Sequence, residues 1–297
     1  MENINTLKIT NQILRKYNII ANKRFGQNFL IDDEILEKII NAADIQKEEL
    51  VIEIGPGLGN LSEYILNKSD YTILVEIDKK MIEIIEDRFN DKKDKYSLLN
   101  EDILKVDIDA VIAEIEKEKN VHFKNVKVIA NLPYYITTPI LFKLLQNSSR
   151  IKDIVVMVQK EVALRMVADK KTKDYGILTL MVEYLTNASI VTIVPNTSFI
   201  PAPNVESAVI KLEKNKKYEI DNENILFDLI HMAFAQRRKK MINSLVSNKF
   251  MNLSKKELED IFLKCNLSLN SRAEELELCD YINIVEEINR SDFNEEK

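Results

Sequence analysis

The sequence predicts an α/β fold in which a parallel, doubly wound sheet is followed by an all-helical region. Two observations lead to this prediction. Apolar runs of strand length alternate with amphipathic segments between residues 50 and 166, which is the order of parallel strands joined by helical crossovers. Beyond residue 224 the apolar residues recur only with helical spacing.

The elements of the sheet region follow one another in a regular order. Strands are expected at residues 50–54, 71–77, 96–102, 126–130, 153–158, 190–194 and 206–212. Helices are expected after Gly59, from Asp78 to about Phe89, at 110–119, from Thr137 or Thr138, from about Lys160 and at 176–185. Asp78 is a favourable N-cap residue, and Pro139 suits a first helical turn.

A polar stretch at residues 214–224 lacks apolar periodicity and is interpreted as a linker. The chain is therefore divided into a sheet domain, residues 1–215, and a helical domain, residues 216–297. Helices of the second domain are expected at about 225–236, 239–249, 254–264 and 279–290.

The composition is that of an ordinary globular protein, 45% hydrophobic and 30% charged over 297 residues. No run approaches the roughly 18 consecutive apolar residues of a membrane span, and the N-terminus lacks the pattern of a secretory signal. Cys265 and Cys279 fit neither a metal spacing nor a disulfide framework. The sequence thus predicts a cytoplasmic protein without a metal site.

The net charge of −6 argues against a nucleic-acid partner, but its distribution does not. Acidic residues are concentrated after Ser271, which leaves the rest of the chain neutral. Within that neutral part the basic residues cluster at Lys8, Arg15, Lys16, Lys23 and Arg24, and again at Arg237, Arg238, Lys239 and Lys240. Such patches are compatible with phosphate binding, although solvated surface is the alternative interpretation.

Three of the five glycines stand together at Gly55, Gly57 and Gly59, between a predicted strand and a predicted helix. The turn resembles the dinucleotide fingerprint but is one residue too short for it. Glycines at this place allow a ligand to lie against the backbone, and a simple tight turn is the alternative.

Acidic residues close the next two strands. Glu76 lies about 20 residues beyond the glycines, where a carboxylate can accept both ribose hydroxyls and disfavours a 2′-phosphate. Asp102 ends the third strand, where it can accept a hydrogen bond from an adenine amino group. Either acid by itself is compatible with a solvated strand end. In order with the glycines, they indicate an adenosine-containing ligand without phosphate, which favours S-adenosylmethionine over NAD.

The fourth strand ends in Asn131, Leu132, Pro133 and Tyr134, beside the expected sulfonium. The Asn131 side-chain oxygen and the Leu132 or Pro133 carbonyl can accept both N–H bonds of an adenine amino group. Pro133 stiffens the backbone, and Tyr134 offers a ring for the base, worth about 1–3 kcal/mol per stacked base. Because neither histidine lies in a motif, catalysis is expected to rest on positioning.

Segments spanning about residues 22–245 resemble the ribosomal RNA small-subunit adenine N6,N6-dimethyltransferase family. They are "KRFGQNFL", "VIEIGPGLGNLS", "VEID", "NED", "NLPYYITTPILF", "VQKEVALRMVA", "YGILTLMVEY", "SFIPAPNVESAVIKL" and "AFAQRRKKMINSL". The resemblance implies a Rossmann-like seven-stranded S-adenosylmethionine-dependent methyltransferase domain with a small helical domain. It also implies dimethylation of two adjacent adenosines near the 3′ end of 16S rRNA in the 30S particle, a role in subunit biogenesis, and a monomer.

The resemblance also assigns expected roles to individual residues. Asn28 and Leu30 look like contacts to the methionine end of the cofactor, which Asn131 also contacts, and Phe199 looks like a second stacking wall. Arg237, Arg238, Lys239 and Lys240 are similar to an RNA-backbone contact, with Lys160 and Arg165 as weaker candidates. The chain departs from the family at Tyr135, where the residue is commonly Asn; we expect it to pack beside the pocket.

Two other functions remain open at this stage. One is the related large-subunit adenine methylation that confers macrolide resistance; Leu132, "PAPNVESAV" and the helical tail favour the small-subunit family instead. The other is a ribosome assembly factor for which binding is the main role and catalysis is secondary.

Overall fold

The computed structural model describes residues 5–19, 26–146 and 148–295. The chain divides into two compact units. The sheet unit comprises Met1–Ala163 and Ala188–Lys214, and the helical unit comprises Leu164–Asn187 and Asn215–Lys297. Within the described ranges, none of the helices is long and apolar enough to cross a membrane.

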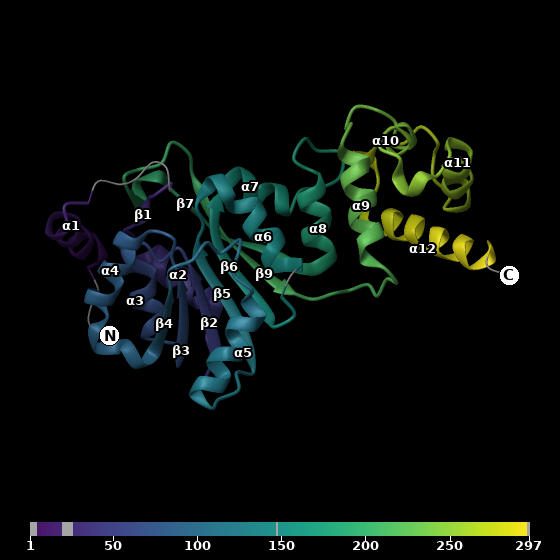
Figure 1. The fold of residues 1–297 in the computed structure, drawn as a ribbon. Coiled ribbons are helices and arrows are strands. Elements are labelled where there is room, and N and C mark those ends of the chain that lie inside the picture. The colour runs from purple at the N-terminus through teal and green to yellow at the C-terminus, as the bar shows by residue number, and fades with distance from the viewer. Residues whose placement is uncertain (1–4, 20–25, 147, 296–297) are drawn as a thin grey trace. The chain divides into compact units, whose positions relative to one another are not determined.

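A seven-stranded sheet forms the centre of the first unit (Figure 1). Its strand order is β4-β3-β2-β5-β6-β9-β7. The strands are β2 (Glu49–Ile54), β3 (Tyr71–Val75), β4 (Tyr96–Leu99), β5 (Asn125–Asn131), β6 (Ile151–Gln159), β7 (Thr186–Val194) and β9 (Ser207–Lys214). Strands β2 to β6 pair in parallel, whereas β9 runs antiparallel to β6, so the predicted parallel sheet is mixed.

Helices connect the strands as the sequence predicts. They are α1 (Thr6–Lys16), α2 (Asp33–Ala43), α3 (Asn60–Leu66), α4 (Lys79–Arg88), α5 (Ile108–Lys119), α6 (Thr137–Gln146) and α7 (Lys160–Met166). The expected cap of α4 is confirmed, because the Asp78 carboxylate accepts a hydrogen bond from the Lys80 amide. Three features lie outside the sequence prediction: helices α1 and α2, which precede β2, and a short antiparallel pair between β1 (Phe29–Leu30) and β8 (Phe199–Ile200).

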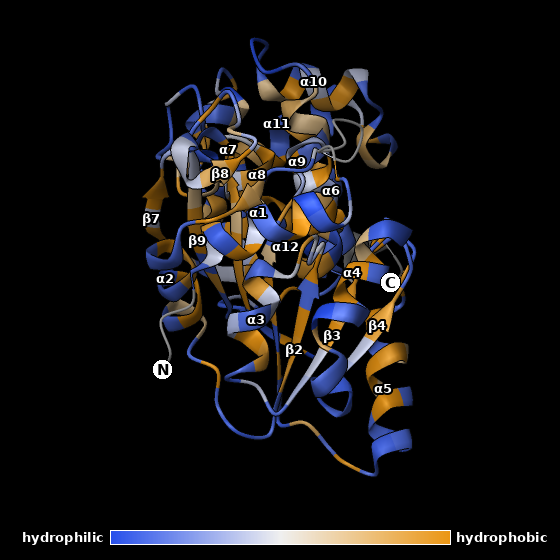
Figure 2. Ribbon diagram, turned by 90° about the vertical axis from the view of Figure 1, so that its left-hand side faces the viewer, coloured by the Kyte–Doolittle hydropathy of each residue, from blue (hydrophilic) through white to orange (hydrophobic). Residues whose placement is uncertain are grey.

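Helices cover both faces of the sheet. Leu36 and Ile39 of α2 share a buried cluster with Val51 of β2 on one face. The next residue of β2, Ile52, points to the opposite face and packs near Ile108 at the start of α5. In Figure 2 strand β2 is largely hydrophobic, while α5 carries both hydrophobic and hydrophilic residues. The central strands β2, β3 and β5 are therefore buried on both faces.

The helical unit contains α8 (Ile177–Leu185), α9 (Glu223–Phe234), α10 (Met241–Ser247), α11 (Lys255–Lys264) and α12 (Leu278–Glu295). Helix α8 belongs to this unit, whereas the sequence placed a single boundary at residue 215. Tyr184 shows why: its hydroxyl donates to Glu223 over 2.7 Å, and its ring meets Phe227 edge-on. The helix predicted at 239–249 begins only at Met241, because residues 235–240 form a turn.

Gly59 is the last glycine of the turn after β2, and its surroundings show why no other residue fits there. Its φ is +80°, and a Cβ atom there would lie 2.7 Å from the Phe89 ring and 2.9 Å from Ile85. A side chain at this position would therefore be strained in the backbone and would also overlap the core. Gly59 is needed for packing rather than for contact with a ligand.

Candidate active site

A cavity opens where strands β2, β3 and β5 end. Ile54 is level with Val75 on one side and with Ala130 on the other, so the residues that follow them leave the sheet at one edge. The predicted residues that line the cavity are Asn28, Leu30, Gly55, Gly57, Glu76, Asp102, Asn131, Leu132, Pro133 and Tyr134. The register of the sheet thus brings together residues that are far apart in the chain.

Glu76 is a buried residue of the cavity lining, and both of its carboxylate oxygens accept hydrogen bonds from the protein. The Gly57 amide donates to Oε2 over 3.1 Å, and the Asp78 amide donates to Oε1 over 2.9 Å. Burial raises the pKa of Glu76 above its usual value, and these two backbone hydrogen bonds oppose that effect. The carboxylate is held in one orientation and retains lone pairs for the hydroxyls of a ligand.

Gly55 and Asp102 lie on either side of Glu76 in the cavity lining. A Cβ atom on Gly55 would meet no other atom within 4 Å, and its φ is +67°. The open space beside this backbone is what a closely apposed ligand requires. Asp102 accepts a hydrogen bond from the Leu104 amide through Oδ1 over 3.0 Å. That bond fixes the carboxylate and leaves Oδ2 for a donor such as an amino group.

Asn131 and Tyr134 are held in place by contacts from distant parts of the chain. Nδ2 of Asn131 donates to the Asn28 carbonyl over 3.1 Å. The Tyr134 hydroxyl lies 2.5 Å from the Ser207 hydroxyl on β9, which anchors the ring from its far end. Burial raises the pKa of Tyr134, so the phenol stays neutral at ordinary pH. Both side chains are therefore oriented before any substrate arrives.

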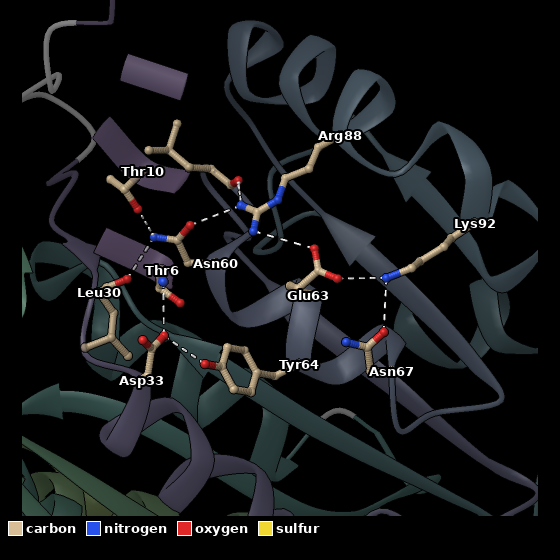
Figure 3. A network of polar contacts seen from close by, with 11 residues as sticks. Thr6, Thr10, Leu30, Asp33, Asn60, Glu63, Tyr64, Asn67, Arg88 and Lys92 are labelled. Carbon is tan, nitrogen blue, oxygen red and sulfur yellow. Dashed lines mark hydrogen bonds and ion pairs between the residues drawn. The ribbon is translucent and has the colours of Figure 1, made fainter. Parts of the chain in front are cut away.

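A polar network surrounds Asn60, which follows the glycine-rich turn and lines the cavity (Figure 3). Asn60 donates through Nδ2 to the Thr10 hydroxyl and to the Leu30 carbonyl, each over 2.8 Å. Arg88 donates to the Asn60 Oδ1 over 3.0 Å and pairs with Glu63, 3.6 Å away. The network joins α1, α3 and α4, and it fixes a residue that lines the cavity.

Glu53 and Asn60 line the cavity but were absent from the sequence prediction. Glu53 Oε2 is buried and has no hydrogen-bond partner among the described residues. Burial raises the pKa of Glu53 to about 8, and the nearby Glu76 carboxylate adds to the effect. A signal was present in the sequence, because Glu53 interrupts an otherwise apolar strand directly before the glycines. Asn60 gave no such signal, since Asn is common after a glycine turn.

The structure does not bring Phe199 to the cavity. Its side chain is 3% exposed and belongs to the same buried cluster as Leu30 and Leu36. Strand β8 pairs Phe199 with Leu30 of β1, which turns the ring into the core. In this conformation Phe199 offers no ring face to a base, so the expected second stacking wall has no support from the geometry.

The residues predicted to bind RNA differ in how many hydrogen bonds they already make within the protein. Arg237 is fully engaged: it donates to Glu274 over 2.6 Å and to the carbonyls of Lys173 and Thr172. Lys240 donates to Asn270 over 2.5 Å. Arg238 and Lys239 are exposed on the turn after α9.

In the sheet unit, Lys160 pairs with Glu206 over 2.8 Å. Arg165, in the part of α7 that belongs to the helical unit, is exposed. Of the basic residues near the N-terminus, Lys16 pairs with Asp87 over 2.6 Å. Lys23 and Arg24 lie outside the described residues.

The chemistry of the lining fits one kind of ligand. Glu53, Glu76, Glu101 and Asp102 line the cavity, and no lysine or arginine is found among its described lining residues. A pyrophosphate would be repelled there, whereas a cationic ligand with hydroxyl and amino donors would be bound. S-adenosylmethionine has a sulfonium, an ammonium, a ribose diol and an adenine amino group. The fold and this cavity define the Rossmann-like class of methyltransferases that depend on S-adenosylmethionine.

Comparison with known proteins narrows this class to a family. The family model described as ribosomal RNA adenine dimethylase matches residues 18–290. A ribosomal RNA small subunit methyltransferase A from Lachnoclostridium phytofermentans is 45% identical over 273 residues, which are 91% of this chain and 92% of the relative. A protein of the same name from Clostridioides difficile is 42% identical over 280 residues, 94% of each chain. The chain belongs to the ribosomal RNA adenine dimethylase family.

Solved structures agree with this assignment. The crystal structure of a dimethyladenosine transferase from Plasmodium falciparum matches with a TM-score of 0.75 and 27% identity, covering 89% of this chain and 98% of that one. The 23S rRNA methyltransferase ErmE matches with a TM-score of 0.64 at 19% identity, covering 88% of this chain and 100% of that one. At that identity the second likeness shows a shared fold only.

Proposed function

We propose that this chain transfers methyl groups from S-adenosylmethionine to N6 of two adjacent adenosines near the 3′ end of 16S rRNA. The substrate is the 30S subunit or its precursor, and the reaction contributes to subunit biogenesis. The chain acts as a monomer in the cytoplasm. Membership of the adenine dimethylase family supports the reaction, and relatives named small-subunit methyltransferases support the substrate.

The cofactor would be held by residues that the sheet edge brings together. Glu76 accepts hydrogen bonds from the ribose hydroxyls, and Asp102 accepts one from the adenine amino group. Gly55 and Gly57 let the ligand approach the backbone, and Asn28 and Leu30 contact its methionine end. The cofactor supplies a methyl group activated by the sulfonium charge.

The target amine would be positioned by Asn131 and the backbone that follows it. Because Asn131 uses Nδ2 for the Asn28 carbonyl, its Oδ1 is left to accept from the adenine amino group. The Leu132 carbonyl accepts the second N–H, because the Pro133 carbonyl already accepts hydrogen bonds from the Ile136 amide and the Thr137 hydroxyl. Tyr134 stacks on the base. These contacts draw the nitrogen toward a tetrahedral shape and aim its lone pair at the methyl group, which is catalysis by orientation.

Proton removal needs no special residue in this scheme. The described residues that line the cavity include no histidine. The nitrogen becomes acidic once it is methylated, and its proton passes to solvent after the transfer. The contribution of the chain is therefore to hold two reactants in line and to exclude competing orientations.

The convergence of Glu76, Asp102 and Asn131 on one cavity carries this proposal, and Asn131 provides its test. Asn131→Ala should lower kcat for methyl transfer to unmethylated 30S subunits by about 100-fold or more, the scale for loss of one well-placed polar group. Asn125→Ala, at the other end of the same strand, is the matched control. Equal incorporation by both variants and the wild type would exclude the mechanism.

RNA contact would come in part from the turn after α9. Arg238 and Lys239 are exposed there and are suited to phosphate oxygens. Arg237 holds the turn through Glu274 and the carbonyls of Thr172 and Lys173. We therefore assign the phosphate contacts to Arg238 and Lys239 and a supporting role to Arg237.

Methylation of large-subunit RNA is the less favoured alternative, because the relatives at 42–45% identity carry the small-subunit name. Expression in a macrolide-sensitive host distinguishes the two. We expect the host to stay sensitive, and acquired resistance would support the alternative.

A role centred on subunit assembly is tested separately from catalysis. Glu76→Ala and Asn131→Ala should both block methylation, and their ability to restore maturation of 30S precursors can then be measured. Full restoration by both variants would show that binding is the main function.

A further inference from the structure

Tyr135 is the aromatic residue that the proposed mechanism leaves unused. Its side chain is 58% exposed, the same fraction as Leu263 and as high as any among the large hydrophobic residues in the described ranges. It lines the same cavity as Asn131 and Tyr134. Its ring is open to solvent beside the proposed place of the target base, so it is available for stacking on another ring.

The local backbone separates the two tyrosines. Tyr134, Tyr135 and Ile136 form a 3₁₀ turn, in which successive side chains point about 120° apart. Tyr134 reaches Ser207 on β9, whereas the Tyr135 ring lies toward Gly26, 3.4 Å from the place a Cβ atom would occupy there. The Tyr134 ring is thus anchored by a hydrogen bond, whereas the Tyr135 ring lies against Gly26 and is open to solvent.

We propose that Tyr135 is the second aromatic surface of the substrate site and stacks on the nucleobase next to the target adenosine. This inference rests on the proposed function, because it requires a single-stranded RNA at the cavity mouth. Since the reaction modifies two adjacent adenosines, the base on Tyr135 is the second adenine while the first occupies the cavity. Tyr135 is a positioning residue in this scheme, and its role differs from the one expected of Phe199, which was to stack on the target base itself.

Kinetics with matched variants test the proposal. Tyr135→Phe keeps the ring, Tyr135→Leu removes it at similar bulk, and Tyr218→Leu removes an exposed tyrosine outside the cavity. We expect Tyr135→Leu to raise KM for unmethylated 30S subunits by roughly 5- to 150-fold, the equivalent of about 1–3 kcal/mol per stacked base. Tyr135→Phe and Tyr218→Leu should stay within about twofold of the wild type.

Cofactor affinity separates stacking from a packing role. The Kd for S-adenosylmethionine, measured by titration calorimetry, should be the same for the wild type and Tyr135→Leu. An unchanged KM for 30S subunits would overturn the proposal. A loss of cofactor affinity as large as the change in KM would also overturn it, because it would show that Tyr135 only supports the loop around Gly26.

Binding of a short RNA keeps this test independent of the proposed function. If the wild type methylated no 30S subunits, the function would fail, but stacking on Tyr135 would still be measurable. A single-stranded RNA carrying 2-aminopurine next to an adenosine should lose fluorescence with the wild type and Tyr135→Phe, and keep it with Tyr135→Leu. Equal quenching by all three proteins would refute stacking on Tyr135.

Discussion

Asn131 and Asn28 are joined by a hydrogen bond of 3.1 Å from the side-chain amide of the first to the backbone carbonyl of the second. The two residues are separated by more than a hundred positions in the chain, and both line the cavity. The bond decides which end of the Asn131 amide faces the substrate. It also couples the segment that receives the target base to the segment expected to hold the methionine end of the cofactor.

Asn131→Asp tests this coupling. A carboxylate keeps the acceptor oxygens but cannot donate to the Asn28 carbonyl, and the two oxygens repel each other. We expect kcat for methyl transfer to fall by roughly 5- to 150-fold, which corresponds to about 1–3 kcal/mol for an unmade polar contact. Radiolabelled methyl incorporation measures the effect, and wild-type activity in this variant would show that the donor is dispensable.

Phe199 should behave as a core residue. Phe199→Leu conserves most of the volume and should cost less than about 1.5 kcal/mol of stability, whereas Phe199→Ala should cost about 3–5 kcal/mol. We expect neither substitution to change KM for 30S subunits in protein that remains folded, and urea unfolding measures the stability of each. A raised KM in a fully stable Phe199→Leu variant would show that the ring reaches the RNA in another conformation.

Glu53 makes stability dependent on pH. Its pKa is about 8 in the folded protein and about 4.5 ordinarily, so between these values the folded state holds a proton that the unfolded state lacks. The free energy of unfolding should therefore fall as the pH rises from about 4.5 to about 8, by at most about 1.4 kcal/mol per pH unit from this group. Below about pH 4.5 Glu53 is protonated in both the folded and the unfolded state, so it adds no further pH dependence to the free energy of unfolding.

Glu53→Gln should remove this dependence, because an amide resembles the protonated acid at every pH. Urea unfolding at pH 5 and pH 8 should show a variant that gains stability over the wild type as the pH rises. Glu101→Gln, an exposed carboxylate of the same cavity, serves as the control and should show no such gain. Parallel pH profiles for the wild type and Glu53→Gln would mean that Glu53 is already ionised.

In the basic turn after α9, one residue should matter for stability and two others for RNA binding. Arg237→Ala should destabilise the protein by about 1–3 kcal/mol through the loss of charged hydrogen bonds. A double substitution of Arg238 and Lys239 with Ala should change stability by less than about 0.5 kcal/mol per site. It should also reduce the slope of log K for RNA against log salt by about 1–2. An unchanged slope would place the RNA contact elsewhere.

Much of the fold could be predicted because its determinants are local. The strand ends, the glycine turn and the Asp78 cap each depend on a few neighbouring residues, and the parallel order then places Gly55, Glu76 and Asn131 at one edge. Their convergence follows from topology and needs no knowledge of side-chain packing.

The features that escaped prediction depend on contacts between distant segments. The sequence around Phe199 suits a pocket wall as well as a core, and only its pairing with Leu30 decides between them. Helix α8 is apolar enough to pack on either unit, and the contact of Tyr184 with Glu223 is not visible in its periodicity. Arg237 belongs to an unbroken basic run in the sequence, but its side chain donates to Glu274 within the protein.

The network around Asn60 extends the site beyond the residues that touch a ligand. Helix α1 supplies the Thr10 hydroxyl to Asn60 and the Thr6 amide to Asp33, over 2.8 and 3.2 Å. A chain trimmed to begin at Gly26 would keep all the described residues that line the cavity. It would nevertheless leave the side-chain amide of Asn60, a residue of the cavity lining, without its Thr10 acceptor. Removal of helix α1 is thus a change to the support of the binding site, and cofactor affinities measured with and without it should differ.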